Sequence, residues 1–320
     1  HVLFRRPEVT LVGPPVAGTV LVGNPHLAEL IVYHPREGEE GRRRALAALA
    51  GRSFDAALFA FARRSESRWL MQAMAAAGVP RRINLEYHDG FLDSRRPWEL
   101  ATHEGWFFWG TMPSPRLLLH ALDPLIAGSP ELDERLELHV TEAARRRADE
   151  LLAGLGLAGR PFAVLSPGGY SSQRWPTASF GRLAVALAAE LDLGVLVEGS
   201  PDEASLLREI EAAVTALAAG KDGLRSIHVR QDPLDVFAAL LARAHLAVTN
   251  DSAPLHFAAA LGVPALYFAQ REKLVHSRPA SASCVALYDA TENDLGRISV
   301  EQALGAILEL TRQFPSPTRQ

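Results

Sequence analysis

Residues 249–268, TNDSAPLHFAAALGVPALYF, place an aspartate, a serine and a histidine around one expected strand-to-helix turn. An apolar run over 245–249 precedes the turn, and a helix is expected over 253–261, ending at Gly262. A helix that begins near Ser252 offers unpaired backbone N–H groups and the positive end of its dipole, both of which favour an anion. The turn therefore predicts an anion site. The alternative is that Asp251 and Ser252 only cap a buried helix.

The composition of the turn narrows the choice of hydrogen-bond donors. Pro254 has no N–H, which suits the first turn of a helix. The candidate donors are therefore the backbone amides of Ala253, Leu255 and His256. A cap explains neither the Asp–Ser doublet nor the histidine, so the pattern favours a bound ligand.

Two further segments carry polar residues directly after expected strands. SPGGYSSQRWP (166–176) opens on Pro-Gly-Gly, which lets a ligand approach the backbone closely, and VEGSPDE (197–203) supplies carboxylates that suit a ribose. Each segment alone has an ordinary alternative, a glycine-rich turn in the first and helix capping by Asp202 in the second. Because the carboxyl ends of parallel strands meet at one edge of a sheet, we expect all three segments to converge.

Strand-like and helix-like segments alternate along the whole chain, which predicts parallel βαβ units with helices on both faces of the sheet. Strands are expected at 9–13, 30–35, 55–61, 162–166, 193–200, 226–229, 245–249 and 265–268. Helices are expected at 39–51, 65–77, 141–153, 177–192, 202–218, 235–244 and 253–261. The stretch 83–115 is expected to be irregular, and the glycine-rich segment 154–161 is the expected hinge between two domains.

Composition excludes several classes of protein. The single cysteine, Cys284, rules out a disulfide framework and a CxxC metal site, and it fits a reducing, cytoplasmic compartment. There is no signal peptide and no uninterrupted apolar run of membrane-spanning length. Residues 42–96 are rich in arginine, which suits phosphate or carboxylate recognition or, alternatively, a solvated helix face. The net charge of −4, without aromatics interleaved among the arginines, argues against nucleic acid.

The segments at 166–176 and 249–268 together resemble glycosyltransferase family 9, the ADP-heptose:lipopolysaccharide heptosyltransferases. SPGGYSSQRWPTASFGRLA is similar to the family's PG…KRWP segment, and VTNDSAPLHFAAALGVPALYF to its D-[ST]-G-P-x-H-[LI]-A-[AG]-[AS]-L-G segment. In the first half, NPHLAELIVY and FDAALFAFARRSESRWLMQAMAAAGVPRRI resemble the corresponding family stretches more loosely. The likeness extends over most of the chain.

The resemblance implies an α/β protein with the GT-B fold, two Rossmann-like domains facing a central cleft. The expected domains are 1–155 for the acceptor and 156–320 for the nucleotide sugar. Inverting transfer of a heptose or related sugar, from an ADP-sugar to a lipopolysaccharide-type or other glycan, would need no metal and no cofactor. The lack of a DxD triplet in the sequence agrees with this. The implied location is cytoplasmic, with peripheral contact at the inner membrane left open.

The resemblance also implies roles for particular residues. Gly168, Gly169, Gln173 and Arg174 would line the phosphates, with Arg174 stabilising charge, and Glu203 or Asp202 would face the ribose. Asp251, Ser252, Ala253, Pro254, Leu255 and His256 would surround the diphosphate. Arg63, Arg64 and Arg68 are the expected acceptor-binding residues.

Three departures from the family pattern keep alternatives open. Gln173 replaces the family's phosphate-facing lysine, and Ala253 replaces a glycine. The sequence lacks the family's opening strand and aspartate loop, so we expect roughly 25–30 residues to be missing before it. The catalytic base therefore stays unassigned, and Glu66 and His103 are only guesses. The alternatives are a catalytically impaired sugar-nucleotide-binding protein and a nucleotide-sugar epimerase of similar fold.

Overall fold

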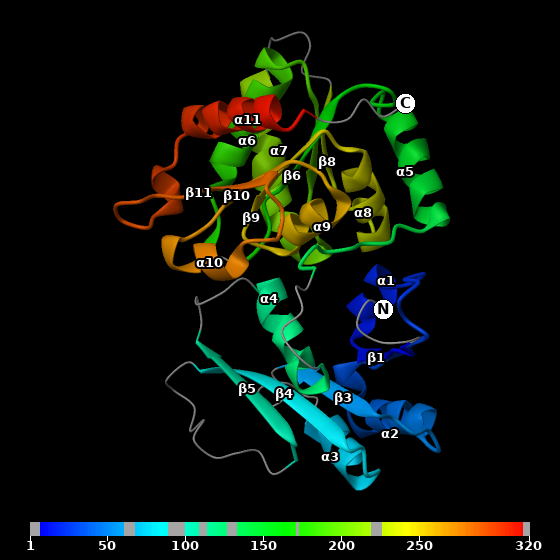
Figure 1. Ribbon diagram of the computed structural model, residues 1–320. Helices are drawn as coiled ribbons and strands as arrows, with labels where there is room; N and C mark the ends of the chain where they lie inside the picture. Colours follow the sequence, from blue (N-terminus) through cyan, green and yellow to red (C-terminus); the bar gives the residue numbers. More distant parts are fainter. Residues whose placement is uncertain are drawn as a thin grey trace. The chain divides into compact units, whose positions relative to one another are not determined.

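The computed structural model describes residues 7–60, 68–88, 100–108, 114–126, 133–170, 173–218 and 226–315. The chain divides into two compact units, His1–Glu134 and Arg135–Gln320. Each unit holds parallel strands and helices, so the expected α/β class is confirmed (Figure 1). No helix among the described residues is both long enough and apolar enough to cross a membrane.

The second unit is built on one parallel sheet in the order β11-β10-β9-β6-β7-β8. Its central strands are buried along their whole length, as expected for strands that helices cover on both faces. The strands are β6 (Phe162–Ser166), β7 (Gly194–Glu198), β8 (Ile227–Arg230), β9 (Leu246–Asn250), β10 (Ala265–Phe268) and β11 (Cys284–Leu287).

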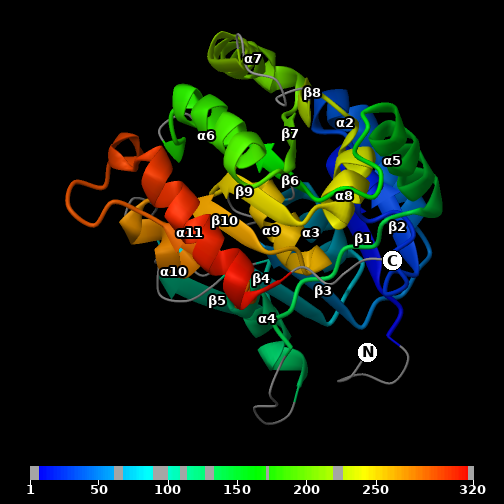
Figure 2. The same cartoon turned by 90° about the horizontal axis from the view of Figure 1, so that it is seen from above.

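Two layers of helices cover this sheet (Figure 2). One layer is α6 (Thr177–Glu190), α7 (Ala204–Ala218) and α11 (Val300–Gln313), and the other is α5 (Glu142–Gly154), α8 (Leu234–Arg243) and α9 (Ala253–Leu261). Alternate strand residues face opposite layers: Leu165 and Val197 pack toward the first, and Val164 and Leu196 toward the second. Short helical turns, η4 (Pro201–Glu203), η6 (Arg271–Lys273) and α10 (Leu274–Ser277), lie in the loops after β7 and β10.

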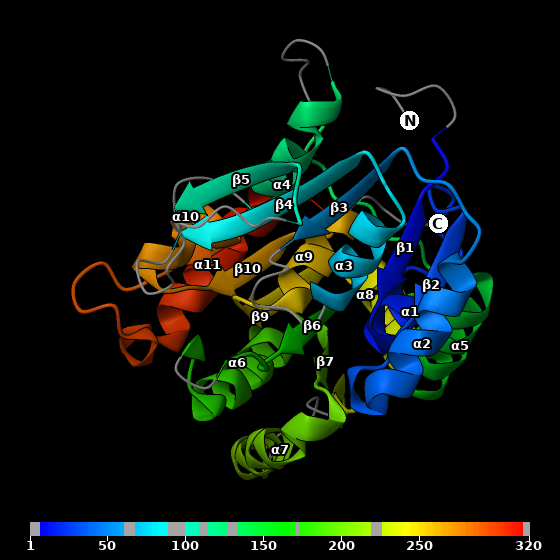
Figure 3. The same ribbon diagram turned by 90° about the horizontal axis from the view of Figure 1, so that it is seen from below.

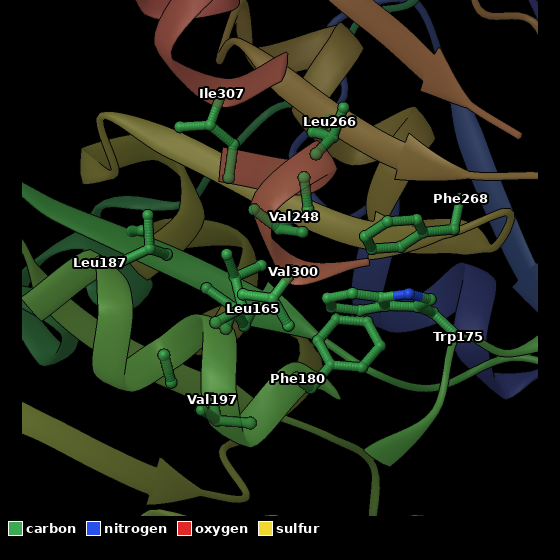
Figure 4. Close-up of a cluster of buried hydrophobic side chains, with 14 of the residues drawn as sticks. Leu165, Trp175, Phe180, Leu187, Val197, Val248, Leu266, Phe268, Val300 and Ile307 are labelled. Atoms are coloured by element: carbon green, nitrogen blue, oxygen red, sulfur yellow. The ribbon is translucent and has the colours of Figure 1, made fainter. Parts of the chain in front are cut away.

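An aromatic cluster anchors the loop after β6 to the first layer. Trp175 is buried, stacks on Phe268 with ring centroids 4.2 Å apart, and meets Phe180 edge-on (Figure 4). Its indole Nε1 donates a hydrogen bond to the carbonyl oxygen of Ile298 at 2.9 Å. The tryptophan of the RWP segment is therefore a structural anchor that fixes where the loop ends.

The described residues of the first unit form two parallel sheets, β1-β2 and β3-β4-β5 (Figure 3). Ile31, Tyr33 and Phe59 contribute to the same hydrophobic core as Met71 and Met74, so residues from both sheets share one core. The elements are β1 (Thr10–Gly13), α1 (Pro15–Val20), β2 (Glu29–Val32), α2 (Gly38–Leu49), β3 (Ala56–Ala60), α3 (Arg68–Ala76), β4 (Arg81–His88), β5 (His103–Phe108) and α4 (Ser114–Leu119).

Three features differ from the sequence expectations. The stretch 83–115 is not irregular throughout, because most of β4 and all of β5 lie within it and pair in parallel. The structural boundary falls at Glu134 rather than at the glycine-rich segment after α5. The cause is that Ala144, Ala148 and Leu152 of α5 pack with the α8 core of the second unit. In addition, β11 and α11 had no counterpart in the expected element list.

Candidate functional site

The site is organised by Asn250, a fully buried side chain at the carboxyl end of β9. Its amide nitrogen donates hydrogen bonds to the carbonyl oxygens of Pro167 at 2.8 Å and Gly168 at 3.0 Å. Its amide oxygen accepts one from the backbone N–H of Trp175 at 2.9 Å. One side chain therefore links the loop after β6 to the turn after β9, which lie on neighbouring strands.

The glycine pair of the β6 loop lets the two segments approach each other. Gly169 has φ +123°, a conformation that disfavours any side chain. A Cβ atom at this position would lie 3.5 Å from the Cβ of Ser252 and 3.8 Å from that of Asn250. The backbone of the loop thus packs directly against the turn that precedes α9.

Glu203 brings the third segment to the same place. Its Oε1 accepts a hydrogen bond from the N–H of Gly169 at 3.3 Å, and its Oε2 accepts one from the N–H of Ser200 at 2.8 Å. A Cβ on Gly168 would lie only 2.0 Å from Oε1, so the carboxylate fits because that position is a glycine. Asp202 is exposed, so Glu203 is the acid that faces the glycine pair. The expected convergence of the three segments is confirmed.

The N-terminus of α9 has no side-chain cap. The Ser252 hydroxyl donates instead to the backbone oxygen of Asn250 at 3.3 Å, and the Asp251 carboxylate accepts a hydrogen bond from Ser277 at 2.5 Å. The N–H of Leu255 donates to the backbone oxygen of Ser252 at 3.0 Å. The simple capping alternative for Asp251 and Ser252 is therefore wrong, since both side chains point to other partners.

Arg174 braces the glycine loop. Its Nε donates to the carbonyl oxygen of Gly169 at 2.6 Å, which places the guanidinium beside the loop. The backbone N–H of Gln173 donates to the carbonyl oxygen of Tyr170 at 2.9 Å, and the Tyr170 side chain is 78% exposed. The loop therefore presents one cation and one neutral amide side by side, without the lysine of the family pattern.

The charge of Asp251 acts on His256, His276 and Tyr267, and two cations of the loop after β10 also act on this group, Lys273 on His276 and Arg278 on Tyr267. Burial lowers the pKa of His256 and of His276, and the Asp251 carboxylate partly opposes this, so both imidazoles are neutral near pH 7. Burial, with Asp251 and Cys284 adding to it, raises the pKa of the Tyr267 phenol to about 12. No ion pair joins Asp251 to an arginine or lysine within the described part of the chain.

A second polar cluster lies at the ends of β7 and β8. Glu198 is 2% exposed, and burial together with the charge of Asp232 raises its pKa to about 8. Arg230 makes a two-pronged ion pair with Asp232, at 2.8 and 2.9 Å, while its Nε lies 3.9 Å from Oε1 of Glu198. This cluster holds a proton at neutral pH and fixes the start of the loop before α8.

The remaining expected residues lie in the first unit. Arg63, Arg64 and Glu66 are outside the described residues. Arg68 is exposed at the start of α3, and His103 is exposed at the start of β5. The geometry of the first unit does not by itself place Arg68 or His103 near a reacting group, so the roles expected for both residues stay predictions.

Sequence reasoning missed three residues that matter to the geometry. Asn250 was visible beside Asp251, but its link to a loop far away in the sequence leaves no local pattern. Ser277 lies 26 positions from the carboxylate it contacts, inside a loop without a motif. Glu198 looked like the last residue of an ordinary strand. In all three cases the partner is supplied by tertiary structure alone.

Solved glycosyltransferases of the GT-B class share this fold. The ADP-heptose lipopolysaccharide heptosyltransferase II of E. coli is 21% identical, with TM-score 0.73 over 97% of this chain and 91% of that one. A family 9 glycosyl transferase of Veillonella parvula is 20% identical, with TM-score 0.77 over 96% and 89%. The E. coli heptosyltransferase WaaC, solved with ADP-2-deoxy-2-fluoro heptose, is 14% identical, with TM-score 0.58 over 94% and 99%. At these identities the likeness establishes the GT-B fold.

The family itself follows from the sequence. The model of glycosyltransferase family 9 (heptosyltransferase) matches residues 116–303, more than half of the chain and all three converging segments. The chain therefore belongs to glycosyltransferase family 9 and is a glycosyltransferase, which confirms the resemblance and leaves the epimerase alternative unsupported. No curated protein matches its sequence.

Proposed function

We propose that this glycosyltransferase moves a heptose, or a closely related sugar, from an ADP-sugar to a lipopolysaccharide-type or other glycan acceptor. The transfer inverts the configuration at the sugar and uses no metal. The observation that carries the proposal is the junction at Asn250. There an uncapped helix N-terminus, a glycine loop with an arginine, and a glutamate from a third strand meet at one sheet edge.

The donor diphosphate would lie at the N-terminus of α9. The amides of the first turn and the helix dipole attract negative charge there, and neither Asp251 nor Ser252 competes as a cap. Gly168, Gly169 and Gln173 would line the phosphates, with Arg174 placed to offset charge that builds up on the departing ADP. Ala253, Pro254, Leu255 and His256 complete the first turn.

Glu203 would accept hydrogen bonds from the ribose hydroxyls. Two backbone N–H groups already hold its carboxylate in place, which leaves further lone pairs on the same oxygens for a ligand. The glycan acceptor would bind the first unit, where Arg63, Arg64 and Arg68 supply forks that suit acceptor phosphates or carboxylates. The site would act in the cytoplasm, at the surface of the inner membrane where a lipid-anchored acceptor is presented.

Calorimetric titration with ADP, UDP and GDP tests the donor site directly. We expect wild type to bind ADP selectively and Glu203→Ala to lose most of that binding, because the variant has no carboxylate to accept hydrogen bonds from the ribose. A heptosyl transfer assay with ADP-heptose then tests the reaction. Absence of binding by all three nucleotides would overturn the proposal, since a donor site must recognise its nucleotide.

One observation favours a second candidate, a sugar-nucleotide-binding protein with impaired catalysis. Gln173 lies where the family carries a lysine, so the loop offers one cation fewer to the leaving group. Such a protein would bind ADP-heptose but would neither hydrolyse it nor transfer its sugar. Single-turnover measurement with excess protein separates the two candidates, because even a slow transferase releases one ADP per site.

A further inference from the structure

Helix α10 contributes a side chain to the turn before α9 from a separate loop. Ser277, the last residue of this four-residue helix, is 6% exposed and donates its hydroxyl to Oδ2 of Asp251 at 2.5 Å. The backbone N–H of Asp251 donates to the carbonyl oxygen of Phe268 at 2.9 Å. The aspartate is thus held at both its main chain and its side chain.

The hydrogen bond from Ser277 uses one oxygen of the Asp251 carboxylate and leaves the other available to a ligand. Charge-assisted hydrogen bonds of this length fix orientation, because the hydroxyl must stay in line with one oxygen. Oδ1 receives no hydrogen bond from the residues that the structure describes, and Asp251 is only half-buried. One oxygen is therefore used to hold the side chain, and the other is presented with its lone pairs available.

The chemistry around that oxygen selects its ligand. His256, His276 and Tyr267, whose pKa values respond to the Asp251 charge, are all neutral near pH 7. A carboxylate repels phosphate oxygens and accepts hydrogen bonds from hydroxyl groups. Asp251 lies directly before the uncapped helix at which the proposed diphosphate ends. The diphosphate of an ADP-sugar joins two sugars, and because Glu203 is assigned to the ribose, the hydroxyl groups left for Asp251 are those of the transferred sugar.

We infer that Ser277 is a positioning residue, through which α10 aims the Asp251 carboxylate at the hydroxyl groups of the transferred sugar. This inference rests on the proposed function. It assigns sugar selectivity to the loop between β10 and β11, and it separates recognition of the sugar from recognition of ADP. His276, the neighbour of Ser277 in α10, is buried as well.

The test is calorimetric binding of two probes, ADP and ADP-heptose, to wild type and to Ser277→Ala. Loss of one charge-assisted hydrogen bond lets the carboxylate rotate, so we expect the Kd for ADP-heptose to rise about tenfold in the variant. The Kd for ADP should change by less than about twofold, because ADP lacks the transferred sugar whose hydroxyl groups Asp251 would contact. Ser277→Thr keeps the hydroxyl and should restore most of the affinity for ADP-heptose.

Ser281→Ala is the matched control, because Ser281 lies in the same loop and its hydroxyl contacts Ser283, at 3.0 Å, and Cys284 rather than Asp251. Equal weakening of both probes in Ser277→Ala would overturn the inference, since Ser277 would then only hold the turn together. Unchanged binding of both would overturn it as well. If wild type bound ADP but gained nothing from the sugar, the inference would fail alone; if wild type bound neither probe, the proposed function would fail with it.

Discussion

The amide oxygen of Asn250 accepts a hydrogen bond from the backbone N–H of Trp175 at 2.9 Å, across 75 positions of sequence. The amide nitrogen of the same side chain holds two carbonyl oxygens of the glycine loop. Trp175 is itself fixed by stacking on Phe268, a residue of β10. The geometry of the candidate site therefore depends on the hydrophobic core of the second unit. A substitution in the site should alter the stability of the core, and a substitution in the core should alter the site.

Replacing Asn250 with alanine tests this link. The change leaves the Trp175 N–H and two carbonyl oxygens without partners in a buried place, so we expect a loss of about 2–3 kcal/mol in the free energy of unfolding. Urea denaturation measures this directly. Asn24→Ala is the control, because its amide oxygen makes one exposed bond, to the N–H of His26. An equal and small effect of both changes would contradict the role given to Asn250.

Gly168→Ala probes the contact between the glycine loop and Glu203. The new Cβ would overlap the Glu203 carboxylate, and either the loop or the glutamate must move. We expect ADP binding to weaken by at least about tenfold, because either movement displaces a group that lines the proposed donor site. Gly305→Ala meets no atom within 4 Å in α11 and should leave binding intact while stabilising the helix slightly. Undiminished ADP affinity in Gly168→Ala would remove this contact from the site.

Much of the second unit was predictable because its signals are local. The strands at 162–166 and 265–268 and the helix at 253–261 are found with the expected bounds. Each combines an apolar run with a glycine or proline directly at one of its ends. The convergence of three segments was also predictable, since it follows from parallel strands sharing an edge. These features depend on short-range pattern and sheet topology, which a single sequence carries.

The rest depends on partners that the sequence does not bring together. Strand β5 was missed because its sequence, HEGWFF, does not alternate apolar and polar residues, and β4 because its alternating residues 83–88 run directly into an aromatic and charged segment. Parallel pairing of β4 with β3 and of β5 with β4 decides the structure of both strands. The assignment of α5 to the second unit follows from packing on α8, which no local pattern encodes. The hydrogen bond from Ser277 to Asp251 likewise joins two loops with separate sequence contexts.

The raised pKa of Glu198 predicts a pH-dependent stability. The folded chain keeps a proton on this carboxyl up to about pH 8, whereas the unfolded chain releases it near 4.5. The free energy of unfolding should therefore fall as pH rises toward 8, at no more than about 1.4 kcal/mol per pH unit. The lowered pKa values of His228, His256 and His276 act in the opposite direction but only at acid pH. The window from pH 7 to 8.5 thus isolates Glu198.

Glu198→Gln is the variant that checks this account, because the amide stays neutral and keeps a similar shape. Urea midpoints should fall between pH 7 and 8.5 in wild type and stay level in Glu198→Gln. The exposed residue Glu190, changed to glutamine, should behave as wild type does. A decline of the same size in Glu198→Gln would show that another group, and not this carboxyl, titrates in the window.

The arginines at the start of α3 and before it are expected to hold the acceptor. Changing Arg63, Arg64 and Arg68 together to glutamine should raise the KM for the acceptor about tenfold and leave ADP binding unchanged, because the charges complement acceptor anions only. Arg43→Gln with Arg44→Gln serves as the control, since both residues are exposed on α2. Acceptor kinetics that do not respond to the triple change would remove these arginines from the acceptor site.

Gln173→Lys asks whether a missing cation limits the reaction. A lysine here would bring positive charge beside Arg174 and the N-terminus of α9, where charge develops on the departing ADP. We expect kcat to rise about tenfold with a smaller change in the donor KM, because the added interaction is strongest in the transition state. Gln173→Met has a similar length without charge and should show no gain. If the lysine variant is no faster, Arg174 and the N-terminus of α9 already neutralise the leaving group. If transfer appears only in that variant, the native protein binds the nucleotide sugar without transferring it, and Gln173 is the cause.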